Sequence, residues 1–273
     1  MPVRVSLPPS FAVTLAEADR PAVGMWVCSG SALVAEICAG SGLDWLLIDM
    51  EHAPNGLESV FAQLQAVAAY PVSPMVRVPV NDPVVIKQVL DLGAQNLLVP
   101  MVSSEAEAVA AIRAVTYPPH GVRGVGSALG RAARWNRVDG YLAEAAGTVS
   151  VIVQVETAAA VEQADAIAAS GVHGILVGPS DLAASMDLIG QQTHPDVVAA
   201  VEYCVAVGRR AGVPVGVNAF DPVAARRYLA AGASFILVGA DVTLLARGSE
   251  AFADQFIPAP STPAQPIQEG TRP

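Results

Sequence analysis

Short apolar runs alternate with amphipathic segments along most of the chain. Runs such as Trp45–Asp49 and Asn96–Val99 end abruptly at polar residues or proline. Between the apolar runs, residues 57–69, 83–92 and 158–169 carry apolar side chains at helical spacing. Short buried strands that alternate with helical patterns indicate right-handed βαβ units and a parallel sheet.

A weak internal repeat extends this pattern. A glycine that would end a helix precedes a turn and a buried strand in residues 39–49, 92–100, 170–178 and 231–239. We predict strands near residues 23–28, 45–49, 74–78, 96–99, 149–155, 175–177, 213–217 and 235–238. About eight strand–helix units predict an α/β fold, a single (β/α)8 TIM barrel with its active site at the carboxyl ends of the strands. We expect the barrel to occupy residues 1–257, and the proline-rich residues 258–273 to form a disordered tail.

Composition narrows the class of protein. Of 273 residues, 53% are hydrophobic, which suits parallel strands covered on both faces. No apolar run approaches the roughly 18 residues that span a bilayer, and the N-terminus does not resemble a signal peptide, so we expect a cytoplasmic protein without a membrane partner. The formal net charge of −10 argues against nucleic-acid and anionic-membrane partners.

Lysine and cysteine usage excludes two kinds of chemistry. Lys87 is the only lysine, and it lies in a helical pattern away from any strand end, so a Schiff-base mechanism and a PLP cofactor are not expected. No glycine-rich motif is spaced for a dinucleotide, so NAD is not expected either. The 3 cysteines form no metal-spaced pair and are interpreted as buried thiols.

Two carboxylates follow consecutive predicted strands. Glu156 ends the fifth strand and Asp181 follows the sixth, and neighbouring strands lie about 4.8 Å apart. Carboxylates held that close need a cation or a shared proton, and an octahedral Mg²⁺ or Mn²⁺ would suit them. The alternative is structural: Glu156 could form a cap or a salt bridge, and Asp181 could cap the next helix.

Charged side chains also end the second and third strands. Arg77 lies in a strand of an acidic, hydrophobic protein, where it could stabilise a developing enolate or simply pair with Asp49 or Glu51. His52 follows both carboxylates at a strand end, and we interpret it as an acid–base group rather than a packed imidazole.

The connection over residues 117–147 is too long for a simple loop and holds four arginines. We interpret it either as a lid for an anionic substrate or as a subunit contact. The arginines are Arg123, Arg131, Arg134 and Arg137.

These motifs together resemble the HpcH/HpaI aldolase family (4-hydroxy-2-oxoheptanedioate aldolase and 2-dehydro-3-deoxyglucarate aldolase) of metal-dependent pyruvate aldolases. The similarity covers residues 24–256. The matching stretches are 44–55 (DWLLIDMEHAPN), 81–102 (from NDP to PMV), 117–126 (YPPHGVRGVG), 134–137 (RWNR), 153–157 (VQVET) and 177–182 (VGPSDL). Met50 and Ser180 depart from the family pattern, in which glycine and alanine respectively are common.

The resemblance implies a role for each matching residue. Glu156 and Asp181 would hold a divalent metal, with Mg²⁺ or Mn²⁺ favoured over Co²⁺ or Zn²⁺. Gln154 and the backbone of Ser180 and Asp181 would hold pyruvate. His52 would be the acid–base residue.

The remaining implied roles concern charge and assembly. Arg77 would stabilise the pyruvate enolate, and Asp49 would support it. The family pairs its histidine with the aspartate that corresponds to Asp91. Because Asp91 ends a predicted helix at the opposite barrel face, this pairing would need a neighbouring subunit or an indirect route. Family members are typically homo-hexamers (trimers of dimers) that exchange a terminal helix, for which residues 240–256 are suited.

The resulting hypothesis is reversible aldol cleavage of a 4-hydroxy-2-oxo acid to pyruvate and an aldehyde. The alternatives are a sugar-acid aldolase of the 2-dehydro-3-deoxyglucarate type, an acyl-CoA lyase, and a catalytically silent barrel used for assembly.

Overall fold

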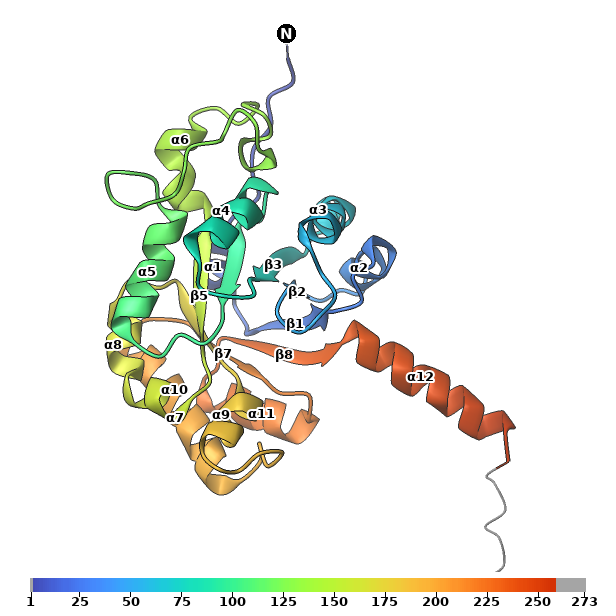
Figure 1. The fold of residues 1–273 in the computed structure, drawn as a ribbon. Coiled ribbons are helices and arrows are strands. Elements are labelled where there is room, and N and C mark those ends of the chain that lie inside the picture. Colours follow the sequence, from blue (N-terminus) through green and yellow to red (C-terminus); the bar gives the residue numbers. More distant parts are fainter. Residues whose placement is uncertain (1, 259–273) are drawn as a thin grey trace, which may run out of the picture.

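Eight parallel strands close into a barrel in the computed structural model, which describes residues 2–258 (Figure 1). Each strand is hydrogen-bonded to the next, and the eighth pairs with the first. The strands are β1 (Ala22–Val27), β2 (Trp45–Asp49), β3 (Ser73–Arg77), β4 (Asn96–Val99), β5 (Ser150–Val155), β6 (Gly174–Val177), β7 (Val215–Asn218) and β8 (Phe235–Ala240). The predicted (β/α)8 barrel is therefore confirmed.

Most of the helices cover the outside of the barrel and connect successive strands, whereas the first precedes β1 and the last follows β8. They are α1 (Phe11–Glu17), α2 (Ala32–Ala39), α3 (Leu57–Ala66), α4 (Pro83–Asp91), α5 (Glu105–Val115), α6 (Tyr141–Glu144), α7 (Ala158–Glu162), α8 (Ala164–Ala169), α9 (Pro179–Ser185), α10 (Pro195–Ala211), α11 (Pro222–Ala231) and α12 (Asp241–Phe256), with 3-10 turns η1 (Val67–Ala69), η2 (Arg131–Ala133) and η3 (Ala145–Thr148). The helix predicted over residues 158–169 is divided at Gln163 into α7 and α8. The tail predicted beyond the barrel lies, after Pro258, outside the described residues.

Aromatic side chains fill the amino-terminal half of the barrel. Trp45 and Phe235 meet edge to face with their ring centroids 5.6 Å apart, and Phe11 of α1 closes the barrel end against both. Gly24 and Gly216 make this packing possible, since a Cβ at Gly216 would lie 2.2 Å from the Phe235 ring. We did not predict α1 from the sequence.

Apolar side chains also fill the layer between strands and helices. All five residues of β2 are buried, as expected for a strand covered on both faces. From α4, Ile86, Val89 and Leu90 pack inward at helical spacing and are fully buried. Burying one such side chain stabilises the fold by about 1.5–3 kcal/mol, so this layer contributes strongly to the stability of the barrel.

The segment over residues 117–147 lies at the amino-terminal end of the barrel. Arg131 donates hydrogen bonds to the carbonyls of Leu64 and Leu92, which lie near the ends of α3 and α4. Arg123 is fully buried, with its guanidinium 4.6 Å from the centre of the Tyr117 ring. The structure therefore does not support a lid over this chain's own carboxyl strand ends.

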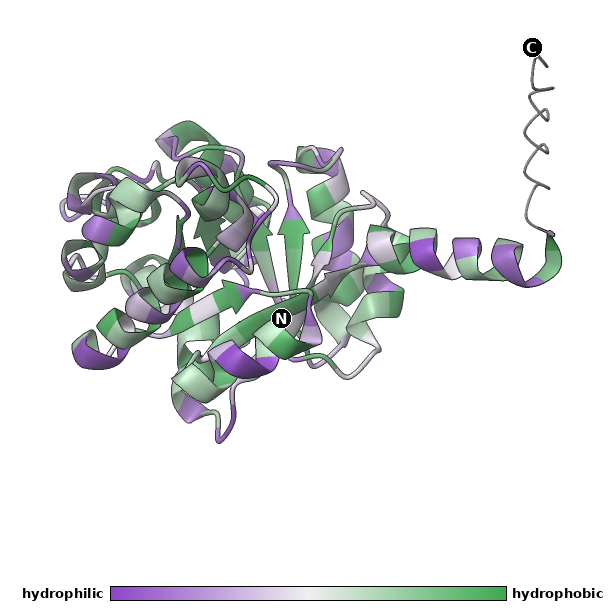
Figure 2. Ribbon diagram, turned by 90° about the horizontal axis from the view of Figure 1, so that it is seen from below, coloured by the Kyte–Doolittle hydropathy of each residue, from purple (hydrophilic) through white to green (hydrophobic). Residues whose placement is uncertain are grey.

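The last described helix, α12, extends away from the barrel (Figure 1). Asp241, its first residue, is the only buried one in the helix. Hydrophobic and hydrophilic residues alternate along its length (Figure 2), and apolar side chains such as Leu244 and Phe252 are 64% and 70% exposed. Within residues 2–258, we find no helix with the length and apolar character needed to cross a membrane.

Candidate active site

Asp49 and Arg77 meet because β2 and β3 bring them into register. They are paired residues at the carboxyl ends of these strands. Arg77 Nε and Nη2 each donate to a different carboxylate oxygen of Asp49 at 2.8 Å, which makes the contact bidentate. Nη1 of the same guanidinium lies 2.9 Å from a carboxylate oxygen of Glu51. The ion pair that the sequence left as an alternative for Arg77 is therefore present, with both candidate carboxylates.

Trp26 of β1 fixes the Arg77 guanidinium from the remaining side. The guanidinium carbon lies 4.2 Å from the indole ring centre, and the indole Nε1 donates to Asn218 Oδ1 at 3.1 Å. Arg77 is 5% exposed, so a cation of fixed position and low mobility lies at the barrel mouth. We did not identify Trp26 from the sequence, because an aromatic residue in an apolar strand carries no signal that distinguishes it from the core.

The turn that carries His52 is folded around the Asp49 carboxylate. One carboxylate oxygen accepts the backbone N–H of Glu51 at 3.0 Å, and the other accepts that of His52 at 3.2 Å. The Asn55 side chain donates to the Asp49 carbonyl at 2.7 Å and closes the turn. His52 itself is exposed, and its imidazole makes no hydrogen bond or ion pair with any residue from 2 to 258. The turn therefore places a solvent-accessible imidazole beside a fixed charge network.

Glu156 is a buried carboxylate just past β5. It accepts the backbone N–H of Met101 at 2.8 Å and a hydrogen bond from the Gln154 amide. Its pKa is raised from 4.5 to about 7, mainly by burial; the charges of Asp181 and Glu51 contribute to the rise, and the hydrogen bonds from Met101 and Gln154 oppose it. Glu51, Glu156 and Asp181 follow β2, β5 and β6 respectively, so all three carboxylates belong to the carboxyl end of the barrel.

Asp181 lies in the first turn of α9, directly after β6. Gly178 is the N-cap of this helix, so Asp181 does not have the capping role considered from the sequence. A Cβ at Gly178 would lie 3.0 Å from a carboxylate oxygen of Glu156 and 3.1 Å from the Gln154 amide nitrogen. Glycine at this position thus lets β5 and β6 bring Glu156 and Asp181 to one side of the mouth. Ser180 and Asp181 are both exposed.

The donors present here fit a divalent cation. The Oε1 atom of Gln154 is buried without a hydrogen-bond partner, a costly arrangement for a polar atom. The raised pKa of Glu156 indicates a carboxylate that lacks a compensating positive charge. Two carboxylates suit a hard cation that keeps several waters. Within residues 2–258, no group of three or more acidic, histidine or cysteine side chains is arranged around a common metal position.

Asp91 is placed apart from the other candidate residues. It ends α4, at the amino-terminal end of the barrel, and one carboxylate oxygen lies 3.8 Å from Arg123 Nη2. Burial raises the pKa of Asp91, while Arg123 opposes the rise. The fold brings Asp49, Arg77, Gln154, Glu156 and Asp181 to one end of the barrel, but it does not bring Asp91 to His52 within one chain.

The remaining sequence predictions concern cysteine and lysine. Cys38 and Cys204 are buried, Cys28 is half-buried, and all three are free thiols. Lys87 lies in the middle of α4 on the outside of the barrel, as predicted. The sequence did not reveal Met101, whose left-handed backbone (φ 55°) directs its N–H at Glu156.

Comparison with known proteins assigns the family. Residues 22–248 match the model of the family described as HpcH/HpaI aldolase/citrate lyase. A protein of Salmonella dublin named 4-hydroxy-2-oxo-heptane-1,7-dioate aldolase is 49% identical over 241 residues, which cover 88% of this chain and 92% of the relative.

Solved structures agree with that assignment. A Burkholderia cenocepacia protein described as a member of the same family superposes with a TM-score of 0.87 at 42% identity, covering 91% of this chain and 99% of the other. An HpcH/HpaI aldolase of Desulfitobacterium hafniense gives a TM-score of 0.81 at 27% identity, covering 93% and 99%. The chain belongs to the HpcH/HpaI aldolase/citrate lyase family.

Proposed function

We propose that the protein is a carbon–carbon lyase that cleaves a 4-hydroxy-2-oxo acid reversibly to pyruvate and an aldehyde, with a divalent metal ion as cofactor. The observation that supports this most is the convergence of Glu156, Asp181 and Arg77 at the carboxyl ends of the strands, where barrels of this kind perform catalysis. The printed name of the Salmonella relative supports 4-hydroxy-2-oxoheptanedioate as the substrate to test first.

In this proposal, Glu156 and Asp181 hold the metal ion, and Mg²⁺ or Mn²⁺ suits these oxygen donors better than Co²⁺ or Zn²⁺. When bound, the ion supplies Lewis-acid polarisation of the substrate's 2-oxo group. Gln154 and the first-turn N–H groups of Ser180 and Asp181 hold the substrate carboxylate, because those N–H groups have no acceptor within α9.

In the same proposal, His52 transfers a proton and Arg77 stabilises the developing negative charge. His52 takes the proton from the 4-hydroxyl group as the C3–C4 bond breaks, and its exposed imidazole is free to exchange that proton with solvent. Arg77 stabilises the negative charge that develops on the enolate oxygen of the departing pyruvate. Asp49 holds Arg77 in place through its bidentate contact, so the cation does not need to reorganise during the reaction.

We further propose that the working enzyme is a homo-hexamer in which α12 packs on a neighbouring subunit. Its exposed apolar residues would be covered there, and the Asp91 carboxylate of one chain would reach His52 of another. Leu244→Ser with Phe252→Ser should reduce the assembly to smaller species in analytical ultracentrifugation. An unchanged sedimentation coefficient would contradict the role of α12.

A sugar-acid aldolase is the second candidate. A cavity of about 200 Å³ adjoins Ser180 and is lined by Asn218, Phe220 and Gln192, among other residues. Several of its side chains are polar, which would suit an aldehyde product that carries hydroxyl groups. This observation favours 2-dehydro-3-deoxyglucarate-type substrates over an acyl-CoA thioester.

The proposed function is tested by following pyruvate release from a panel of 4-hydroxy-2-oxo acids and 2-dehydro-3-deoxy sugar acids, with and without a chelator. We expect metal-dependent pyruvate release from at least one member. Glu156→Gln should abolish it, whereas Glu162→Gln, an exposed glutamate of α7, should not. Activity that survives complete metal removal would contradict the mechanism, and no pyruvate from any panel member would favour the silent barrel.

A further inference from the structure

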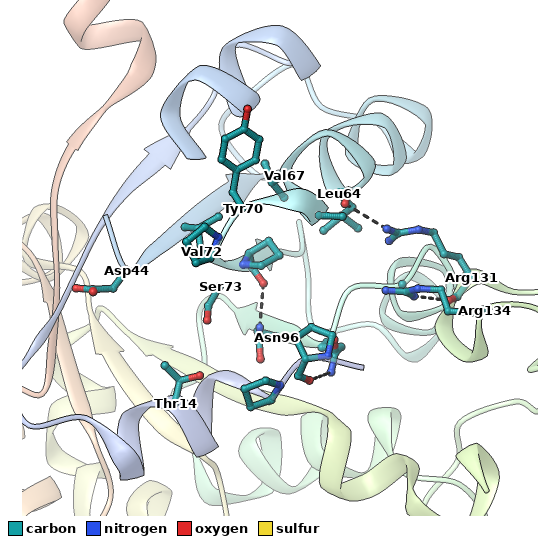
Figure 3. Close-up of a pocket in the computed structure, with 17 residues that line it drawn as sticks. Thr14, Asp44, Leu64, Val67, Tyr70, Val72, Ser73, Asn96, Arg131 and Arg134 are labelled. Carbon is teal, nitrogen blue, oxygen red and sulfur yellow. Dashed lines mark hydrogen bonds between the residues drawn. The ribbon is translucent and has the colours of Figure 1, made fainter. Parts of the chain in front are cut away.

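A second cavity lies at the amino-terminal end of the barrel, opposite the proposed active site. Its volume is about 380 Å³, within the range of small-molecule pockets. It opens between the starts of β3 and β4 and the turn that holds Arg131 and Arg134 (Figure 3). The proposed reaction uses none of its residues.

Two arginines line one end of this cavity without a carboxylate partner among residues 2–258. Arg131 is 9% exposed, and its guanidinium donates only to the backbone carbonyls of Leu64 (3.3 Å) and Leu92 (3.4 Å). Arg134 is half-buried and donates to the carbonyl of Arg131. Figure 3 shows both guanidinium groups side by side at the same end of the cavity. Buried arginines are normally paired with acidic groups, so this arrangement is unusual.

The two guanidinium groups approach the same point beside Gly93, where the absence of a side chain leaves space for both. A Cβ there would lie 2.8 Å from Arg131 Nη1 and 3.0 Å from Arg134 Nη1, so both nitrogens approach one point. The left-handed φ of +95° at this glycine is one that other residues rarely adopt. Burial, with a smaller contribution from the charge of Arg134, lowers the pKa of Arg131 to about 10. Mutual repulsion of this kind is relieved when an anion binds between the two groups.

The carboxylate that lines the cavity is already neutralised. Asp44 lies at the other end of the cavity from the arginine pair (Figure 3). Its two oxygens accept hydrogen bonds from Arg20 at 2.7 Å each, and one also accepts the backbone N–H of Val23 at 2.8 Å. Asp44 therefore does not supply the missing negative charge.

Between the arginine pair and Asp44, the wall is largely apolar. Val67, Tyr70 and Val72 contribute to it. We propose that this cavity binds a small organic anion, with its phosphate or carboxylate group between Arg131 and Arg134 and its apolar body against Val67, Tyr70 and Val72. Guanidinium groups bind both oxyanions in bidentate fashion, so the two headgroups are distinguished by experiment.

The test is isothermal titration calorimetry on the full-length protein in its native assembly, at low ionic strength and without phosphate buffer. The probes are phenyl phosphate, benzoate and inorganic phosphate. We expect phenyl phosphate to bind more tightly than inorganic phosphate, because it adds the apolar contact. Arg134→Gln should weaken binding by about tenfold or more through the loss of charge-assisted hydrogen bonds.

Two further variants make the result decisive. Arg226→Gln removes the same charge from an exposed position on α11 and should leave the affinity unchanged. Arg131→Lys keeps the positive charge but loses the planar fork, so it should weaken binding through the loss of bidentate geometry. Equal affinity in the wild type and Arg134→Gln would assign the binding to the active site or the general surface and overturn the proposal. Absence of binding for all three probes at about 10 mM would also overturn it.

Discussion

Two arginine–aspartate pairs flank β2, and they provide a matched comparison of a buried and an exposed ion pair. At the carboxyl end, the side chains of Arg77 and Asp49 are 6% and 2% exposed. At the amino end, those of Arg20 and Asp44 are 59% and 26% exposed. Both contacts are bidentate; Asp44 also accepts one backbone N–H group, and Asp49 accepts two. Asparagine at either position removes the charge and keeps the shape.

The structure predicts very different costs for the two substitutions. Asp49→Asn leaves the buried Arg77 guanidinium with only Glu51 as an anionic partner, and breaking a buried pair costs about 3–5 kcal/mol. Because Glu51 remains, we expect the lower end of that range. Asp44→Asn breaks a solvent-screened pair, which is worth about 0–1 kcal/mol. Activity should also separate the variants, since displacing the Arg77 cation by about 1 Å would lower kcat about a hundredfold.

Both quantities are measurable on the same preparations. Urea unfolding at one fixed protomer concentration gives the change in unfolding free energy, and pyruvate release gives kcat. We expect a large loss of both for Asp49→Asn and little change in either for Asp44→Asn. Equal unfolding free energies for the two variants would refute the argument that burial of the Arg77–Asp49 pair makes it structurally important. Wild-type kcat in Asp49→Asn would refute the positioning role.

Three further predictions concern Glu156 and the barrel packing. Burial raises the pKa of Glu156 from 4.5 to about 7, so the metal-free native state binds more protons than the unfolded chain between these pH values. The unfolding free energy of the metal-free protein should therefore fall by about 3 kcal/mol as pH rises through that window, and Glu156→Gln should remove this pH dependence. Identical pH slopes of the unfolding free energy in the wild type and the variant, measured by urea unfolding, would contradict the raised pKa of Glu156. Protons and the cation compete for the Glu156 carboxylate, so the Mn²⁺ affinity measured by calorimetry should weaken by about tenfold per pH unit below about pH 7. A pH-independent affinity would argue against Glu156 as a ligand. A Cβ at Gly216 would meet the Phe235 ring at 2.2 Å, so Gly216→Ala should lower the unfolding free energy by about 1–3 kcal/mol, whereas Gly147→Ala, with no atom within 4 Å, should not; equal effects would count against the packing argument.

The barrel was predictable because its strands are short, apolar and regularly spaced. Most strand residues are buried on both faces, so the strand sequences are largely continuous rather than alternating, and glycine marks many of the preceding helix ends. The helix α1 was not predicted, because its interaction with the barrel depends on Phe11 meeting Trp45 and Phe235, which lie far away in the sequence.

The candidate site was predictable only where a polar residue interrupts or ends an apolar strand. Asp49, Arg77 and Glu156 satisfy that criterion, and the fold brings them to one end of the barrel. Trp26 and Met101 do not, since one contributes an aromatic face and the other a backbone N–H. No local pattern in a sequence records such contributions, because they arise from strand register and backbone conformation.

The placement of Asp91 and the arginine segment depended on long-range packing in the same way. The sequence shows four arginines in one connection, but not that Arg123 and Arg131 turn inward at the amino-terminal end of the barrel. Burial of a charged side chain depends on partners from other elements, such as the carbonyls of Leu64 and Leu92 that accept from Arg131. The density of arginines in this segment therefore predicted a surface role for all four, whereas Arg123 and Arg131 are buried in the structure.

The central claim is that Glu156 anchors the divalent cation needed for pyruvate release. The most direct measurement is the rate of pyruvate formation from 4-hydroxy-2-oxoheptanedioate by chelator-treated enzyme as Mg²⁺ or Mn²⁺ is added back, for the wild type and Glu156→Gln. We expect saturable recovery in the wild type and no recovery in the variant at the same metal concentrations. Full activity of the chelated wild type, or the same recovery curve for both proteins, would contradict it.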